Sequence, residues 1–149
     1  MASIYQEYIT NAIAWAMTHL GSPEYAGRCL SFVEDAMEQG NQIEMFGGAS
    51  AHESAVEYQA AAQHGTPPRG AFVFYDWIGT LNGERKNWGH VGLMLDDMKI
   101  IHAWDVVRVD EYRAIETLTA SDGSHPTYLG WAPPQRFLQG MKQRNPVKL

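Results

Sequence analysis

Apolar residues follow two different spacings along this chain, and the change between them divides it into two parts. In the first part they recur every three or four residues, as on the buried face of a helix. This spacing predicts helices at about residues 3–20, 29–39 and 50–63. Ser3 and Ser50, each followed three residues later by Gln or Glu, have the form of capping boxes and mark two of the helix starts.

Gly40 follows the second predicted helix and is expected to end it. From Ala71 onward the apolar residues lie in short runs that predict strands, and Pro133 and Pro134 suit the start of a closing helix. The strands are expected at about residues 71–75, 90–95, 99–104, 106–109 and 127–132, with a polar loop around Asn82-Gly83 and a short helix within 110–119. Helices followed by strands, without alternation, predict an α+β fold in which N-terminal helices pack on a central antiparallel sheet. The length fits one domain, residues 1–149.

Two histidines bracket an apolar hairpin in the segment GHVGLMLDDMKIIHAW, residues 89–104. A two-residue turn at Asp96-Asp97 would place His90 and His102 on opposite faces of the sheet. A three-residue turn, residues 96–98, pairs Gly92 with His102 and brings both imidazoles to one face, within reach of each other. We predict the three-residue turn.

Cys29 is the single cysteine, so no intramolecular disulfide can form. It lies where the loop GSPEYAGR enters a predicted helix, and the positive end of a helix lowers the pKa of a thiol. The N–H groups of that first turn can also hold an oxyanion. A lone cysteine or a lone histidine is more often structural than catalytic. Their combination predicts a nucleophile, a base and a group that orients the base.

The motifs GRCLSFV, GAFVFYDW and GHVGLMLDDMKIIHAW follow one another in the order found in the NlpC-type peptidases of bacterial cell-wall turnover. The chain resembles that family over roughly residues 9–109. The resemblance implies a papain-like α+β fold, with Cys29 as nucleophile, His90 as general base and His102 as the orienting residue. The related CHAP amidases share this motif order, and a CHAP-like amidase remains an alternative.

The chain departs from the family pattern around the nucleophile, where Arg28-Cys29-Leu30 replaces the usual Asp-Cys-Ser. In the family these flanking residues help to recognise the free amine of a peptidoglycan stem peptide, whereas Arg28 would repel an amine and attract a carboxylate. Tyr25 stands in for a family tyrosine near the nucleophile, and Trp88 and Trp104 flank the histidines. We therefore predict Arg28, Tyr25, Trp88 and Trp104 as substrate-binding residues.

The amino-acid composition further narrows the classes of function that this chain could have. The net charge is −6 with a pI of about 5.4 and no basic stripe, which argues against a nucleic-acid partner. No segment predicts a membrane span or a signal peptide. The site of action is therefore open, and a peptidoglycan substrate would place it outside the cell or at the wall. The oligomeric state is open too.

The leading interpretation is a cysteine hydrolase that acts on an amide or isopeptide bond of a peptidoglycan-type peptide and needs no cofactor or metal. Three further alternatives stay open. They are an acyltransferase with the same three residues, a zinc site made by Cys29, His90 and His102, and a non-catalytic binding module. The absence of a close ligand pair such as CxxC or HxxxH speaks against zinc.

Overall fold

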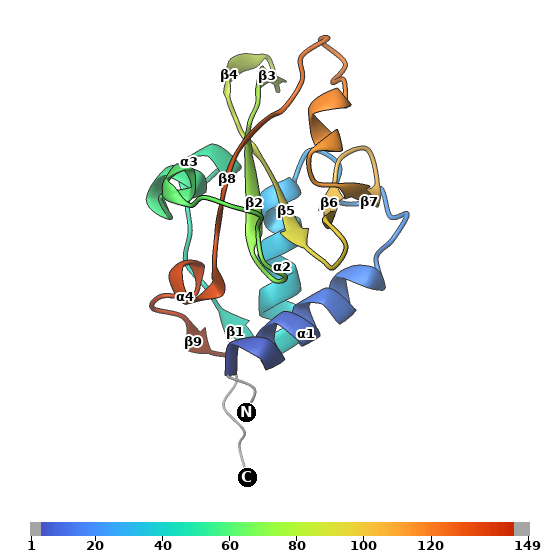
Figure 1. The fold of residues 1–149 in the computed structure, drawn as a ribbon. Coiled ribbons are helices and arrows are strands. Elements are labelled where there is room, and N and C mark those ends of the chain that lie inside the picture. The colour runs from blue at the N-terminus through green and yellow to red at the C-terminus, as the bar shows by residue number, and fades with distance from the viewer. Residues whose placement is uncertain (1–3, 145–149) are drawn as a thin grey trace.

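The computed structural model describes residues 4–144. Within them the α-helices are α1 (Ile4–Met17), α2 (Cys29–Asn41), α3 (Ala51–Glu57) and α4 (Pro134–Phe137), and the 3₁₀ helices are η1 (Ala60–Ala62) and η2 (Ala114–Thr117). The strands are β1 (Ile43–Glu44), β2 (Phe72–Asp76), β3 (Ile78–Leu81), β4 (Glu84–Asn87), β5 (His90–Met94), β6 (Lys99–Ala103), β7 (Val107–Glu111), β8 (Thr127–Ala132) and β9 (Lys142–Gln143). The fold is α+β, as predicted (Figure 1).

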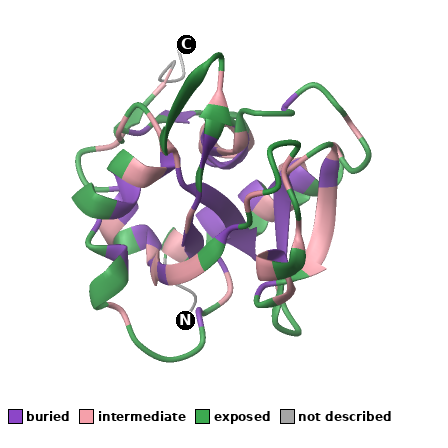
Figure 2. Ribbon diagram, turned by 90° about the horizontal axis from the view of Figure 1, so that it is seen from above, coloured by how far each residue is buried: buried purple, intermediate pink, exposed green. Residues whose placement is uncertain are grey.

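The central sheet has five strands in the order β7-β6-β5-β2-β8, and all of its pairs are antiparallel. Helix α2 packs on β5 and β6, and α1 packs on α2 (Figure 1). Burial follows this layering, because the central strands and the inward faces of the helices are buried while the loops around them are exposed (Figure 2). Among the helices of residues 4–144, none is both long and apolar enough to cross a bilayer.

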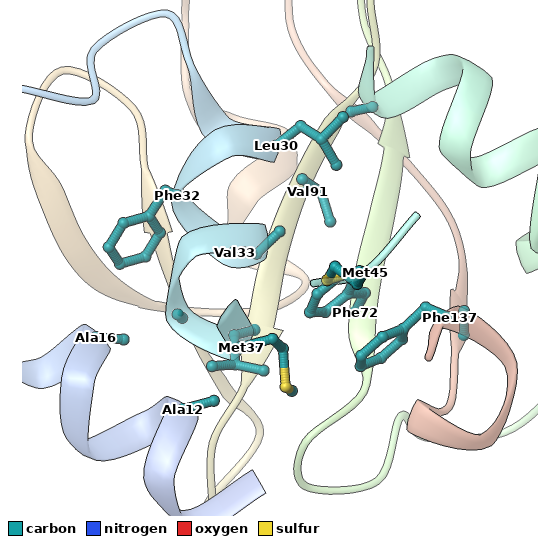
Figure 3. Packing of buried hydrophobic residues seen from close by; sticks show 14 of the residues in the cluster. Ala12, Ala16, Leu30, Phe32, Val33, Met37, Met45, Phe72, Val91 and Phe137 are labelled. Atoms are coloured by element: carbon teal, nitrogen blue, oxygen red, sulfur yellow. The ribbon is translucent and has the colours of Figure 1, made fainter. Parts of the chain in front are cut away.

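Alternate residues of each central strand enter two different cores, as the pleat requires. Phe72 and Val91 face α2, where Val33 and Met37 meet them, and the ring of Phe137 stacks on Phe72 with 3.7 Å between centroids (Figure 3). The opposite face of the sheet packs against η2 and its flanking loops, through residues that include Val73, Tyr75, Ile100, Tyr112 and Ile115.

The predicted helices are present, but their C-terminal ends differ, and α1 stops at Met17 instead of about Leu20. Ser50 caps α3 by accepting a hydrogen bond from the Glu53 N–H, yet the α-helix stops at Glu57 instead of about Gln63. Gly40 does not end α2, which continues to Asn41. Its role is close packing, because a Cβ there would lie 2.8 Å from the backbone oxygen of Asn11 in α1. The Ser3 cap predicted for α1 lies outside the described residues.

Residues 78–87 form a separate hairpin, β3–β4, where the sequence predicted only a polar loop. Asn82 and Gly83 both have positive φ angles, of 52° and 79°, as a two-residue hairpin turn requires. The hairpin projects beyond the central sheet (Figure 1). Its first strand follows Trp77, whose indole N–H donates to Ser124 at 2.8 Å and so ties this segment to the loop before β8.

Candidate active site

Cys29 is the first residue of α2, as predicted, and it is half-buried. The preceding residue, Arg28, has a non-helical backbone (φ −131°, ψ 50°) and its side chain does not cap the helix, so the N–H groups of the first turn stay available. The sulfur also lies near β5, since the backbone N–H of Val91 hydrogen-bonds to it. Val91 is the chain neighbour of His90, so the helix start and this strand meet at the thiol.

The hairpin prediction is confirmed. Leu93 pairs with Ile101, and Leu95 with Lys99 closes a three-residue turn, so His90 and His102 lie on the same face of β5 and β6. Their rings share a hydrogen bond of 2.8 Å between Nε2 of His90 and Nδ1 of His102. Both side chains are buried, and the rings of His90 and Trp104 pack in a T-shaped arrangement with 5.2 Å between centroids.

Strand β7 adds two residues that the sequence analysis did not identify. Asp110 accepts a hydrogen bond of 2.8 Å from Nε2 of His102, and Arg108 donates to both oxygens of the same carboxylate, at 2.8 and 3.3 Å. The result is a continuous chain of contacts from His90 through His102 and Asp110 to Arg108.

The sequence contains a signal that could have identified Arg108 and Asp110 as residues of the site. We predicted β7 to end at Val109 and a short helix to follow, which removed Asp110 from the sheet. A strand that continues to Glu111 pairs His102 with Arg108 and places Asp110, two positions on, on the same face. Extending the register from the histidine hairpin would therefore have found both residues.

Burial is the largest influence on the pKa values of Cys29, His90 and His102. It raises the pKa of the Cys29 thiol to about 11, although backbone N–H groups, that of Val91 first, act against it. This corrects the expectation that the helix terminus would lower the thiol pKa. Burial also holds the pKa of His90 well below its usual value and lowers the pKa of His102. The hydrogen bond from His102 lowers the pKa of Asp110 to about 2. The resting site therefore combines a thiol, two neutral imidazoles and a carboxylate.

Cys29 and His90 line one cleft of about 740 Å³. Its walls come from the start of α2, the segment before α3, the β3–β4 turn, the segment after β6 and the loop at residues 119–121. Three of the predicted substrate-binding residues, Arg28, Trp88 and Trp104, contribute to the lining, and Trp77 adds a third indole.

Tyr25 lies outside this lining, and its role in substrate binding stays a prediction. Its ring is buried against Phe32, and its hydroxyl donates to Asp35 at 2.6 Å. The guanidinium of Arg28 stacks on the ring of Tyr25, 5.0 Å from the centroid. Tyr25 therefore supports Arg28 at the rim of the cleft.

Glu34 is a further acidic residue in the cleft wall, about one and a half helical turns beyond Cys29. Burial, and then the charges of Glu38 and Asp35, raise the pKa of its carboxyl to about 7. A carboxylate that folding has desolvated beside a candidate nucleophile is a typical feature of a functional site. The cleft thus carries a cation at its rim, Arg28, and acidic groups at Glu34 and Asp105.

A zinc site made by the three predicted residues would conflict with these contacts. Both ring nitrogens of His102 are already engaged, by His90 on one side and Asp110 on the other. Within residues 4–144, no group of three or more His, Cys, Asp or Glu side chains has an arrangement that could hold a metal ion.

Comparison with known proteins gives a likeness of fold. No family model matches the chain, and no curated protein matches its sequence significantly. Among solved structures, the P60 domain of an antigen from M. avium paratuberculosis aligns with a TM-score of 0.50, over 85% of this chain and 94% of that chain. The two sequences are 13% identical. At that identity the likeness establishes the fold alone, which is the papain-like α+β fold of the P60 domain.

Proposed function

We propose that this chain is an NlpC-type cysteine hydrolase that cleaves an amide or isopeptide bond in peptidoglycan stem peptides. The observation that carries the proposal is the meeting of Cys29, at the start of α2, with His90 in one cleft, while His102 holds the His90 ring from behind. The papain-like fold and its P60 neighbour support the same reaction class.

The resting protonation states favour a general-base mechanism over a preformed thiolate–imidazolium pair. Sγ of Cys29 attacks the substrate carbonyl carbon while its proton passes to Nδ1 of His90, the ring nitrogen that His102 does not occupy. The carbonyl oxygen takes up the negative charge, and N–H groups at the start of α2 stabilise it. The C–N bond then breaks and His90 returns the proton to the leaving amine. Water, deprotonated by His90, hydrolyses the thioester and releases the thiol.

The charges of the cleft support a peptide substrate that itself carries charges of both signs. Arg28 at the rim suits a carboxylate, and Glu34 inside the wall suits an ammonium group. Stem peptides carry both groups. The indoles of Trp77, Trp88 and Trp104 add apolar surface against which such a substrate can pack.

The test is mass spectrometry of purified muropeptides incubated with the protein, with Cys29→Ala as the matched control. We expect products whose masses differ from the starting peptides by cleavage of one amide bond, and none with Cys29→Ala. The masses also separate the alternatives, because a CHAP-like amidase would cut a different amide bond and an acyltransferase would join the acyl group to an added amine. Unchanged muropeptides with the wild-type protein contradict the proposed substrate.

A binding module on the same fold requires a different measurement. Iodoacetamide reports on Cys29 alone, because the chain has a single cysteine. If His90 is the base, alkylation at pH 7–8 should slow markedly in His90→Ala. A rate that does not depend on His90 favours a non-catalytic thiol.

A further inference from the structure

The hydrogen-bond chain behind His90 continues further than the catalytic mechanism above requires. It links four side chains from three adjacent strands, namely His90 on β5, His102 on β6, and Asp110 and Arg108 on β7. Both histidines of this hydrogen-bond chain are buried. The Asp110 carboxylate accepts hydrogen bonds from His102 on one side and from Arg108 on the other. We propose that Asp110 is a positioning residue that selects the tautomer of His90 through His102. This inference rests on the proposed role of His90 as a base.

The direction of every hydrogen bond follows from the charged end. Asp110 is ionised and can only accept, so Nε2 of His102 carries the hydrogen in the 2.8 Å contact between them. Since the His102 ring is neutral, its Nδ1 has no hydrogen and must accept. Nε2 of His90 therefore donates to it across the second 2.8 Å contact. A neutral His90 with hydrogen on Nε2 has its lone pair on Nδ1, which is the form that can take the proton of a thiol.

Without Asp110, no hydrogen-bond acceptor beside His102 would favour one of the two tautomeric arrangements of the histidine pair over the other. Both rings could reverse together, so that Nδ1 of His102 donates to Nε2 of His90. The hydrogen of His90 would then sit on Nδ1, and the ring would have no lone pair for the thiol. Loss of the correct tautomer is among the larger single defects known for a catalytic histidine, up to about 10⁴-fold in rate.

Arg108 fixes the carboxylate in the orientation that this selection needs. Its Nε donates to Oδ2 of Asp110, the same oxygen that accepts from His102, and its terminal nitrogen contacts Oδ1. Arg108 also contacts Asp105 at the edge of the cleft, at 3.4 Å. The charged groups around the histidine pair are thus Asp110, Arg108 and Asp105, with Cys29 and Tyr75 as the neighbouring titratable groups on α2 and β2.

The first experiment observes the tautomers directly and needs no substrate. In ¹⁵N-labelled protein, NMR spectra that correlate ring nitrogens with ring protons should show both His90 and His102 as Nε2–H tautomers. In Asp110→Ala the pair should become a mixture. In Asp110→Asn, Nε of Arg108 should hold the amide oxygen where Oδ2 stood, so that this oxygen still accepts from His102 and the wild-type tautomers persist. An Nδ1–H form of His90 in the wild type, or unchanged tautomers in a folded Asp110→Ala, overturns the inference.

The second experiment measures the consequence for the thiol. The rate of Cys29 alkylation by iodoacetamide at pH 7–8 should fall by about tenfold or more in Asp110→Ala, and less in Asp110→Asn. Where muropeptides are cleaved, kcat should fall with KM unchanged, because Asp110 does not contribute to the cleft wall. Glu111→Gln, the next residue of β7 and exposed, is the matched control and should behave as wild type.

The two measurements separate this inference from the proposed function. A tautomer change in Asp110→Ala without any change in alkylation would show that Asp110 sets the tautomer while His90 is not the base, which contradicts the proposed function alone. Equal alkylation rates together with equal tautomers contradict the positioning role. Circular dichroism of each variant excludes misfolding, and if Asp110→Ala does not fold, the tautomer of His90 in the wild type still decides, because an Nδ1–H form there overturns the inference.

Discussion

His102 uses both of its ring nitrogens inside the protein, one toward His90 and one toward Asp110. A replacement can keep this role only if it presents an acceptor to one neighbour and a donor to the other. Glutamine does so, because its amide oxygen can accept from His90 while its NH₂ group donates to Asp110. His90 has no such substitute, because the amide of glutamine or the methyl group of alanine cannot take the proton of the thiol.

We therefore expect His90→Ala to abolish muropeptide cleavage and His102→Gln to retain a measurable fraction of kcat. His102→Ala should lie between them, because it removes the orientation of the base but not the base itself. Steady-state kinetics of the three variants provide the test. Equal and complete loss in His90→Ala and His102→Gln, in folded proteins, contradicts the division of roles and favours a metal site if bound zinc is lost as well.

Glu34, in the cleft wall, lowers the free energy of unfolding when its carboxyl group is charged. Its pKa is raised to about 7 from an ordinary value of 4.5, so the folded protein binds a proton there more tightly than the unfolded chain does. Stability must then fall as pH rises from about 4.5 to about 7, and the loss is complete above that window. A glutamine at this position stays neutral, so the protein would not lose stability there over this pH range.

Glu34→Gln should accordingly raise the free energy of unfolding by about 1–2 kcal/mol above pH 7, after allowance for the partial exposure of the carboxylate. The gain should disappear toward pH 4. Urea denaturation across this pH range measures it. Glu44→Gln is the control, because Glu44 is exposed on β1 and is not among the charges that raise the Glu34 pKa, so no gain is expected. A destabilised Glu34→Gln protein at pH 8 would show that the carboxylate is well satisfied in the fold.

At the scale of the element, the histidine hairpin could be predicted because side-chain parity allows only two outcomes, and the turn decides between them. The turn residues Asp97 and Met98 both have positive φ, which closes a loop of three residues. The β3–β4 hairpin could not be found in the same way, since its strands are mostly exposed and show no apolar alternation. The Asn82-Gly83 dipeptide was the remaining sequence signal for a hairpin turn, and the same dipeptide also fits a loop that joins no paired strands.

Gly92 lies on β5 where the side chains of Ile100 and His102, both on β6, come close to its backbone. A Cβ there would lie 2.5 Å from Cδ1 of Ile100 and 3.1 Å from Cβ of His102. Gly92→Ala should therefore destabilise the protein by about 1–3 kcal/mol and displace His102 from His90. Thermal unfolding and kcat measure the two effects, with Lys99→Ala, exposed on the same hairpin, as the control. An alanine variant with wild-type stability and kcat would mean that Ile100 moves aside freely.

At the scale of the whole molecule, the walls of the cleft come from segments far apart in sequence. The start of α2, the segment before α3, the β3–β4 turn and residues 119–121 meet only because β2 lies between β5 and β8. The motif order identified the candidate catalytic residues, but periodicity cannot give this strand order. Consequently Arg28, Trp88 and Trp104 could be proposed as wall residues from their neighbours in the chain, whereas Glu34 and Trp77 could not.

The charge pattern of that assembled cleft leads to the prediction on substrate choice. Arg28 lies at the rim, stacked on Tyr25, where the NlpC-type pattern has an aspartate. A guanidinium there should disfavour an ammonium group and favour a carboxylate, by about 1.5–3 kcal/mol, or one to two powers of ten in relative rate. We expect slow cleavage of stem peptides with a free N-terminus, relative to the same peptides with a blocked one. Arg28→Asp should reverse this preference.

The comparison uses kcat/KM for matched free and blocked peptides in the wild type, in Arg28→Asp and in a charge control. Arg113→Asp is a close match, because Arg113 also stacks on a tyrosine ring, 4.8 Å from the centroid of Tyr128, but lies outside the cleft lining. It changes the net charge equally, so any effect of overall charge on peptide binding appears in both variants. A preference that shifts only in Arg28→Asp assigns the selection to the rim of the cleft. If the wild type already prefers the free amine and Arg28→Asp weakens that preference, then Arg28 points away from the bound peptide, and Glu34 and Asp105 are the acidic groups of the cleft that can receive the amine.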